Sequence, residues 1–266
     1  MSNDTVTDAD TLVAEVESGA RNPVGWQLKL FLGITFCWSL YQLFIATALP
    51  YYLAEATGLS IFLDTLNHAR RIHLSFALVL AAMAYPLLRS SSRHTIPLYD
   101  WILAALGVIT CFYAVINYET IANRSGSFNN TDITVGTIGL IVVAIAVYRS
   151  LGLPLLIVAS VFVAYVFFGS GEWVPETLRW KGASVGKSLW HYWIQDEGVF
   201  GKALDVSATM IFLFVLFGSI LEKAGAGNYF IKLAFSLLGH LRGGPAKAAV
   251  AASALSGVYS GSSIAN

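Results

Sequence analysis

The residues best suited to chemistry stand at the end of the sequence, in the small polar run Ser260-Gly261-Ser262-Ser263-Ile264-Ala265-Asn266. Consecutive small polar residues near membrane depth require partners other than lipid, and a broken helix supplies them. Where a half-helix ends, free carbonyl groups and the serine and asparagine oxygens can coordinate a sodium ion, while free N–H groups can face an anion. We therefore predict that this run contacts an ion or a substrate.

Before this run, small residues recur at every fourth position. Ala249, Ser253, Gly257 and Gly261 fall on one face of the expected helix, because positions four apart in a helix lie above one another. Such a face lets two backbones approach closely, and close packing with interhelical hydrogen bonds holds helices together in lipid. Plain helix packing explains Ala249, Ser253 and Gly257 as well as a functional role does, and we assign them to packing.

Other motifs give weaker signals. The segment Gly182-Ala183-Ser184-Val185-Gly186-Lys187-Ser188 resembles a phosphate-binding loop, but three residues separate its glycines where that motif has four, and no strand precedes it. It is therefore expected to be a polar loop at the membrane interface. No metal-ligand spacing and no convergent acid, base and nucleophile set is visible, so we predict no organic cofactor and no enzymatic activity.

The histidines lie at the ends of apolar runs, away from the run centres where the ligands of a membrane haem are expected. We predict that all five are interfacial, in water or lipid headgroups. They are His68, His73, His94, His191 and His240.

The elements that must position these residues are helices in a membrane. Hydrophobic residues make up 56% of the chain and charged residues 12%, whereas a soluble domain carries about 25% charged residues. The apolar surplus must face lipid. The formal net charge is zero, so no basic surface for nucleic acid is implied.

The apolar runs are long enough to cross a membrane, since a spanning helix needs roughly 20 apolar residues. The sequence predicts an all-α integral membrane protein with about six transmembrane helices, followed by the first arm of a re-entrant hairpin. The run 133–168 is too long for one span and is expected to break near Gly152. The segment 169–203, with four of the seven tryptophans, is expected along the interface. The runs are 28–53, 72–88, 98–118, 133–168 and 204–221, and the hairpin arm is 245–266.

The stretch from Leu204 to Asn266 resembles the start of the large membrane subunit of tripartite ATP-independent periplasmic (TRAP) transporters. The upstream half, with His73 opening one run and Tyr99-Asp100-Trp101 opening the next, is similar to the fused permeases of the TAXI-type branch. The motifs that carry the first resemblance are Phe212-Leu213-Phe214-Val215-Leu216-Phe217-Gly218, Glu222-Lys223-Ala224-Gly225, Leu238-Gly239-His240-Leu241-Arg242-Gly243-Gly244-Pro245, Ser256-Gly257 and Ser260-Gly261-Ser262-Ser263.

This resemblance implies a domain organisation. Residues 1–27 would form a cytoplasmic acidic leader and residues 28–150 a helical region like the small subunit. Residues 151–266 would form the start of the large permease domain. Because the family pattern continues beyond Asn266, the resemblance also implies that the chain is an N-terminal fragment of a longer protein.

The resemblance further implies sodium-driven uptake of an organic acid, C4-dicarboxylate-like or a related carboxylate. A separate periplasmic substrate-binding protein would deliver the acid to a multi-pass permease in the bacterial inner membrane, surrounded by lipid. In the family, a small polar motif in the first re-entrant hairpin helps to form a sodium site. That motif corresponds here to Gly261, Ser262, Ser263 and Asn266.

A second reading of the sequence is a membrane scaffold or assembly subunit that does not transport. Its small-residue face would serve only to bind partner helices. This reading explains the stretch from Ala249 to Gly261 but leaves the polar run after it unexplained.

Overall fold

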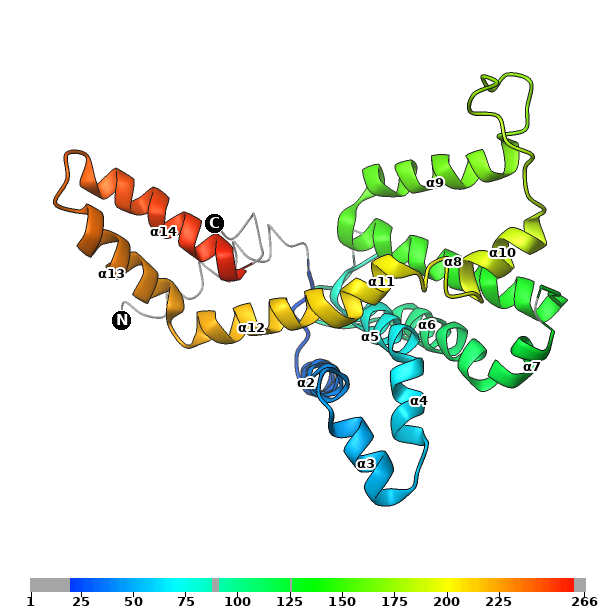
Figure 1. Cartoon of the computed structure of the whole chain (residues 1–266), viewed down its shortest axis with the longest axis horizontal. Helices are drawn as coiled ribbons and strands as arrows, with labels where there is room; N and C mark the ends of the chain where they lie inside the picture. The colour runs from blue at the N-terminus through cyan, green and yellow to red at the C-terminus, as the bar shows by residue number, and fades with distance from the viewer. Residues whose placement is uncertain (1–19, 88–90, 125, 261–266) are drawn as a thin grey trace.

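The computed structural model describes residues 20–87, 91–124 and 126–260, with the backbone alone for 258–260. Every regular element within these ranges is a helix (Figure 1), which confirms the all-α membrane class. Four helical stretches there are long and apolar enough to cross a membrane, and the expected count of about six and the re-entrant hairpin stay predictions. The four are α2 (Trp26–Ala46), α6 (Leu98–Ile116), α8 (Asn130–Leu151) and the continuous stretch Lys202–Lys223.

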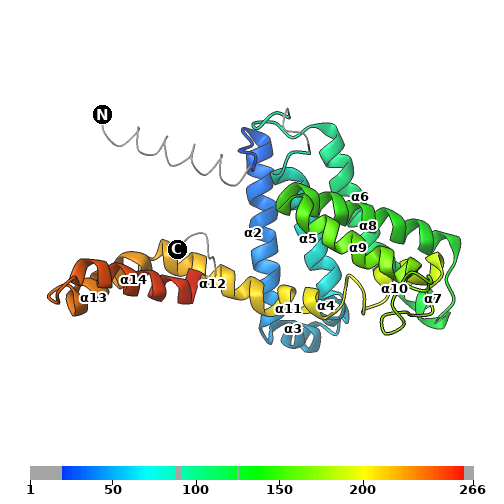
Figure 2. The ribbon, with the colours of Figure 1, turned by 90° about the horizontal axis from the view of Figure 1, so that it is seen from above.

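The chain up to residue 193 folds as a helical bundle of α2, α5, α6 and α8, with α10 packed on α8. Figure 2 shows α2 and α5 running alongside each other, with α3 and α4 joining them at one end. The other elements of this part are α3 (Leu49–Thr57), α4 (Ile61–Asn67), α5 (Ala69–Ala84), α7 (Tyr118–Asn123), α9 (Leu153–Phe168) and α10 (Val185–Trp193).

The ends of α8 follow from local chemistry. At its start, the side chain of Asn129 accepts from the backbone N–H of Asp132 and the carboxylate of Asp132 accepts from that of Asn129, a reciprocal cap. At its end, Gly152 has a φ of +83°, which glycine adopts without steric cost, and Pro154 occupies the first turn of α9. The break predicted near Gly152 is confirmed.

A buried ion cluster ties the start of α2 to α6 and α8. Asp100 on α6 is fully buried and lies 2.6 Å from Nη1 of Arg21 and 2.5 Å from Nη1 of Arg149. Two guanidinium groups thus share one carboxylate. Both also donate to backbone carbonyls, Arg21 to that of Ala82 and Arg149 to that of Tyr85, which lowers the cost of burying charge.

Trp193 is the centre of the core. Its side chain is fully buried and its Nε1 donates to the carbonyl of Thr110 at 3.0 Å. The indole lies against α8 at Gly139, where a Cβ would overlap the ring, and Gly136 admits the backbone of α10 in the same way. Two glycines on α8 thus give Trp193 a site within the protein, and the interfacial position of the segment 169–203 stays a prediction.

Gly139→Ala is expected to lower the thermal stability of the detergent-solubilised protein. The added methyl group overlaps Trp193, so α8 and α10 must separate, and overpacking of this kind costs about 1–3 kcal/mol. Thermal unfolding followed by tryptophan fluorescence measures the change. Gly33→Ala on α2 is the matched control, because no atom lies within 4 Å of its added methyl group. Equal unfolding midpoints for the two variants would contradict the packing described here.

Candidate functional site: the C-terminal hairpin and its link to the bundle

The polar run at the end of the sequence is preceded by a pair of helices, here called the C-terminal hairpin. It consists of α13 (Ala226–Leu238) and α14 (Gly244–Ser260) and follows α12 (Phe212–Lys223). The turn between α12 and α13 contains Gly225, with a φ of +89°, and the turn between α13 and α14 contains Gly243, with a φ of +70°. Figures 1 and 2 show the hairpin at the far end of α12 from the helical bundle, with α14 running back beside α13.

Small side chains hold the C-terminal hairpin together. Ala234 on α13 and Ala248 and Ala252 on α14 are buried against one another, with Leu238 and Ala251 packed around them. Because none of the three buried residues extends beyond Cβ, the two helices can approach closely, which is how helices pack in lipid.

The predicted packing residues lie on a different face of α14. Ala249, Ser253 and Gly257 are exposed, each one position after a residue of the row Ala248, Ala252 and Ser256. One position corresponds to a rotation of about 100° around the helix. The face of Ala249, Ser253 and Gly257 therefore lies outside the buried contact between α13 and α14, and its packing against another helix stays a prediction.

The predicted ion- or substrate-binding residues lie outside the described residues. Gly261, Ser262, Ser263 and Asn266 directly follow α14 in the sequence. The structure thus positions the helix that leads into the polar run, and the sodium assignment stays a prediction.

A polar contact joins the helical bundle to Ser207, which lies in the stretch that leads through α12 to the C-terminal hairpin. Gln42 on α2 is fully buried, and its amide nitrogen donates to Nδ1 of His73 on α5. With Nδ1 as acceptor, the imidazole proton is on Nε2, which faces the hydroxyl of Ser207 at 3.4 Å. The rings of Trp38 and Phe212 flank the imidazole, with ring centroids 5.1 and 5.8 Å away.

Ser207 begins a turn of π-helix, η1 (Ser207–Ile211), between α11 (Lys202–Val206) and α12. Such turns are rare and occur frequently at functional sites. Here the wide turn buries Ala208 completely and faces Ser207 toward His73. α2, α5 and the stretch that leads to the C-terminal hairpin therefore meet at one polar cluster.

The expectation that His73 is interfacial is wrong. Its residue surface is 4% exposed, and it contacts Gln42 rather than water or headgroups. The signal that could have found this contact is Gln42 itself, an amide within the apolar run 28–53 that needs a polar partner at that depth.

With this geometry in place, comparison with protein families gives a match for the C-terminal part of the chain. A family model described as the tripartite ATP-independent periplasmic transporter, DctM component, matches residues 138–266, just under half of the chain. Residues 138–266 are therefore similar to the membrane component of a TRAP transporter. The match begins within α8 and takes in the C-terminal hairpin and the polar run that follows it.

The match agrees with the four apolar candidate spans among the described residues, and together they support a multi-pass membrane protein. The matched family is a component of a transporter and not an enzyme family. No curated protein and no solved structure matches the chain.

Ala248→Leu is expected to loosen the C-terminal hairpin, whereas Ala249→Leu should not. Ala248 is fully buried against α13, so a larger side chain there forces the helices apart at a cost of about 1–3 kcal/mol, while Ala249 is exposed. Hydrogen exchange of α13 and α14 amides, followed by mass spectrometry, should be roughly tenfold faster in Ala248→Leu alone. If both variants, or only Ala249→Leu, exchanged faster, the packing face described for α14 would be incorrect.

Proposed function

We propose that this chain is the membrane permease component of a sodium-coupled secondary transporter. It would take up organic acids, C4-dicarboxylates or related carboxylates, that a periplasmic binding protein delivers to the bacterial inner membrane. The observation that carries the proposal is the match of residues 138–266 to the DctM component. The description of that family as ATP-independent and periplasmic supports a transporter driven by an ion gradient.

Sodium is proposed as the coupling ion because of the residues that follow α14. Gly261, Ser262, Ser263 and Asn266 offer carbonyl, hydroxyl and amide oxygens without a formal charge. Interrupted helices near the centre of the membrane present such oxygens to sodium in secondary transporters. A neutral oxygen set binds a monovalent cation without the cost of burying a free carboxylate in the membrane.

The first half of the chain is proposed to act as a support for the permease domain. On this proposal residues 1–27 are a cytoplasmic leader, 28–150 a small-subunit-like region and 151–266 the start of the permease domain, as in the fused TAXI-type branch. The contact between His73 and Ser207 supports a fused arrangement, because it joins the region 28–150 to the start of the stretch that carries the C-terminal hairpin.

A scaffold without transport activity is the weaker alternative. It accounts for the exposed small-residue face of Ala249, Ser253 and Gly257. It gives no reason for a match to a transporter component that extends through the polar run to Asn266.

Ser262→Ala and Asn266→Ala are expected to raise the sodium concentration required for half-maximal uptake by roughly tenfold, since one lost ion ligand of about 1.4 kcal/mol has that effect. The measurement is uptake of radiolabelled carboxylates by proteoliposomes containing the transporter that includes this chain, together with its binding protein.

Ser219→Ala is the matched control, because this exposed serine on α12 only donates to the carbonyl of Val215 in its own helix. Its sodium dependence should equal that of the unmodified protein. If neither Ser262→Ala nor Asn266→Ala changes the sodium dependence, these two residues are not sodium ligands.

A further inference from the structure

A pocket of about 590 Å³ lies along one face of α10. It is lined by Ser184, Lys187, Ser188 and His191, which are related by steps of three or four residues and so lie on one face of the helix. The loop that contains Lys181 also lines the pocket. This is the segment whose sequence resembles a phosphate-binding loop with one residue too few. The structure places it in a loop and a helix, without a preceding strand, next to the end of α9.

The charged groups of this pocket are cationic. Lys181 and Lys187 both line it, and neither forms an ion pair with a carboxylate in the parts of the chain that the structure describes. No Asp or Glu is among its lining residues. His191 has an acidic neighbour: its Nδ1 donates to Oε1 of Gln195 at 2.8 Å and lies 3.9 Å from a carboxylate oxygen of Glu197. Two unpaired cations therefore converge on one cavity.

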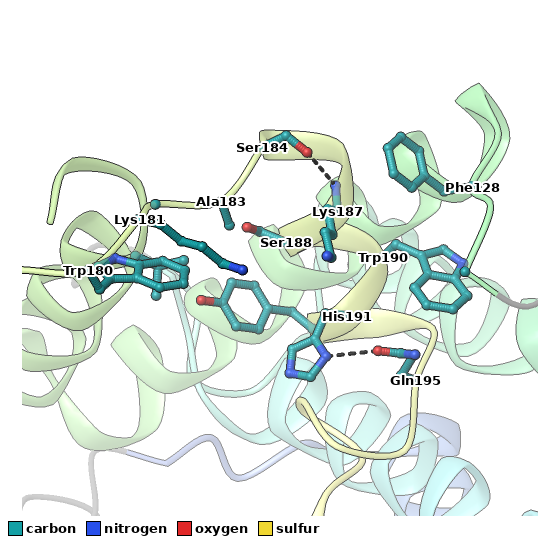
Figure 3. Close-up of a pocket in the computed structure, with 14 residues that line it drawn as sticks. Phe128, Trp180, Lys181, Ala183, Ser184, Lys187, Ser188, Trp190, His191 and Gln195 are labelled. Carbon is teal, nitrogen blue, oxygen red and sulfur yellow. Dashed lines mark hydrogen bonds between the residues drawn. The ribbon is translucent and has the colours of Figure 1, made fainter. Parts of the chain in front are cut away.

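Ser188 supplies a second and independent sign of a ligand. The residue is 4% exposed, and its hydroxyl is buried with no hydrogen-bond partner among the described residues. Buried hydroxyl groups nearly always have a partner, so an orphaned one calls for an unrecorded acceptor. Figure 3 shows the Ser188 hydroxyl and the amine of Lys181 directed into the pocket, with Lys187 on the same side of α10.

The remaining walls are aromatic. Trp180, Trp190, Tyr192 and Phe128 line the pocket beside the polar groups. Tryptophan and tyrosine rings are typical of the headgroup level of a membrane. Burial raises the pKa of the Tyr192 phenol, which therefore stays protonated and able to donate near pH 7. The cavity is also larger than a bare phosphate ion needs and lies in the range of small-molecule sites, about 300–1,000 Å³.

We propose that this pocket binds a phosphate group that Lys181 and Lys187 contact with their amines and Ser188 with its hydroxyl. The phosphate belongs either to the headgroup of an anionic phospholipid or to free phosphate. The aromatic walls and the volume favour the phospholipid, whose glycerol and acyl portion would cover Trp180 and Phe128.

The test is titration of the purified protein with phosphatidylglycerol in neutral detergent, with binding followed by native mass spectrometry. Sodium, substrate and the binding protein are absent, so failed transport and failed phosphate binding are distinguishable. The double variant Lys181→Gln/Lys187→Gln is expected to weaken phosphatidylglycerol binding by more than tenfold and Ser188→Ala by a few-fold. The arginine variant Lys187→Arg should bind as the unmodified protein does.

Lys29→Gln/Lys247→Gln is the control, because it removes two other exposed lysines and the same amount of charge. Phosphatidylcholine should bind more weakly than phosphatidylglycerol. Competition with inorganic phosphate distinguishes the sources: displacement of the lipid indicates a free phosphate site, and its persistence indicates a lipid site. Equal phosphatidylglycerol binding by the Lys181→Gln/Lys187→Gln variant and its control, or binding of neither phosphatidylglycerol nor phosphate, would overturn the proposal.

Discussion

The polar groups of this protein must find partners inside the protein, because a hydrocarbon layer offers none. Gln42 shows the constraint most clearly, since it is fully buried on a helix whose other side chains are partly or fully exposed. Its contact with His73 fixes α2 against α5, and Ser207 brings the C-terminal region to the same point. At the other end of α2, Arg21, Asp100 and Arg149 join three helices in the same way.

Close approach between helices supplies the rest of the architecture. Gly139 admits the ring of Trp193, and Ala248 admits α13, so small residues decide which helices touch. In lipid such packing replaces the hydrophobic effect as the source of helix association. The long apolar helices then provide membrane residence, while the C-terminal hairpin carries the polar run that the family match includes.

Much of this organisation could be predicted from the sequence. Apolar runs and the break at Gly152 depend on local composition, and the motifs from Leu204 onward indicated the family. The face of α14 that packs on α13 could not be chosen, because Gly244, Ala248, Ala252 and Ser256 repeat every four residues just as Ala249, Ser253 and Gly257 do. Only the position of Ala234 distinguishes them. The burial of His73 and Trp193 could not be predicted either, because their partners, Gln42 and Gly139, lie on helices far away in the sequence.

The central claim is that this chain contributes to sodium-coupled uptake without nucleotide hydrolysis. The most direct measurement places the transporter that contains it, with its binding protein, in vesicles without ATP and imposes an inward sodium gradient. The account predicts that a labelled carboxylate accumulates above its external concentration and that collapse of the sodium gradient abolishes the accumulation. Accumulation that requires ATP, or that persists without the sodium gradient, would contradict the account.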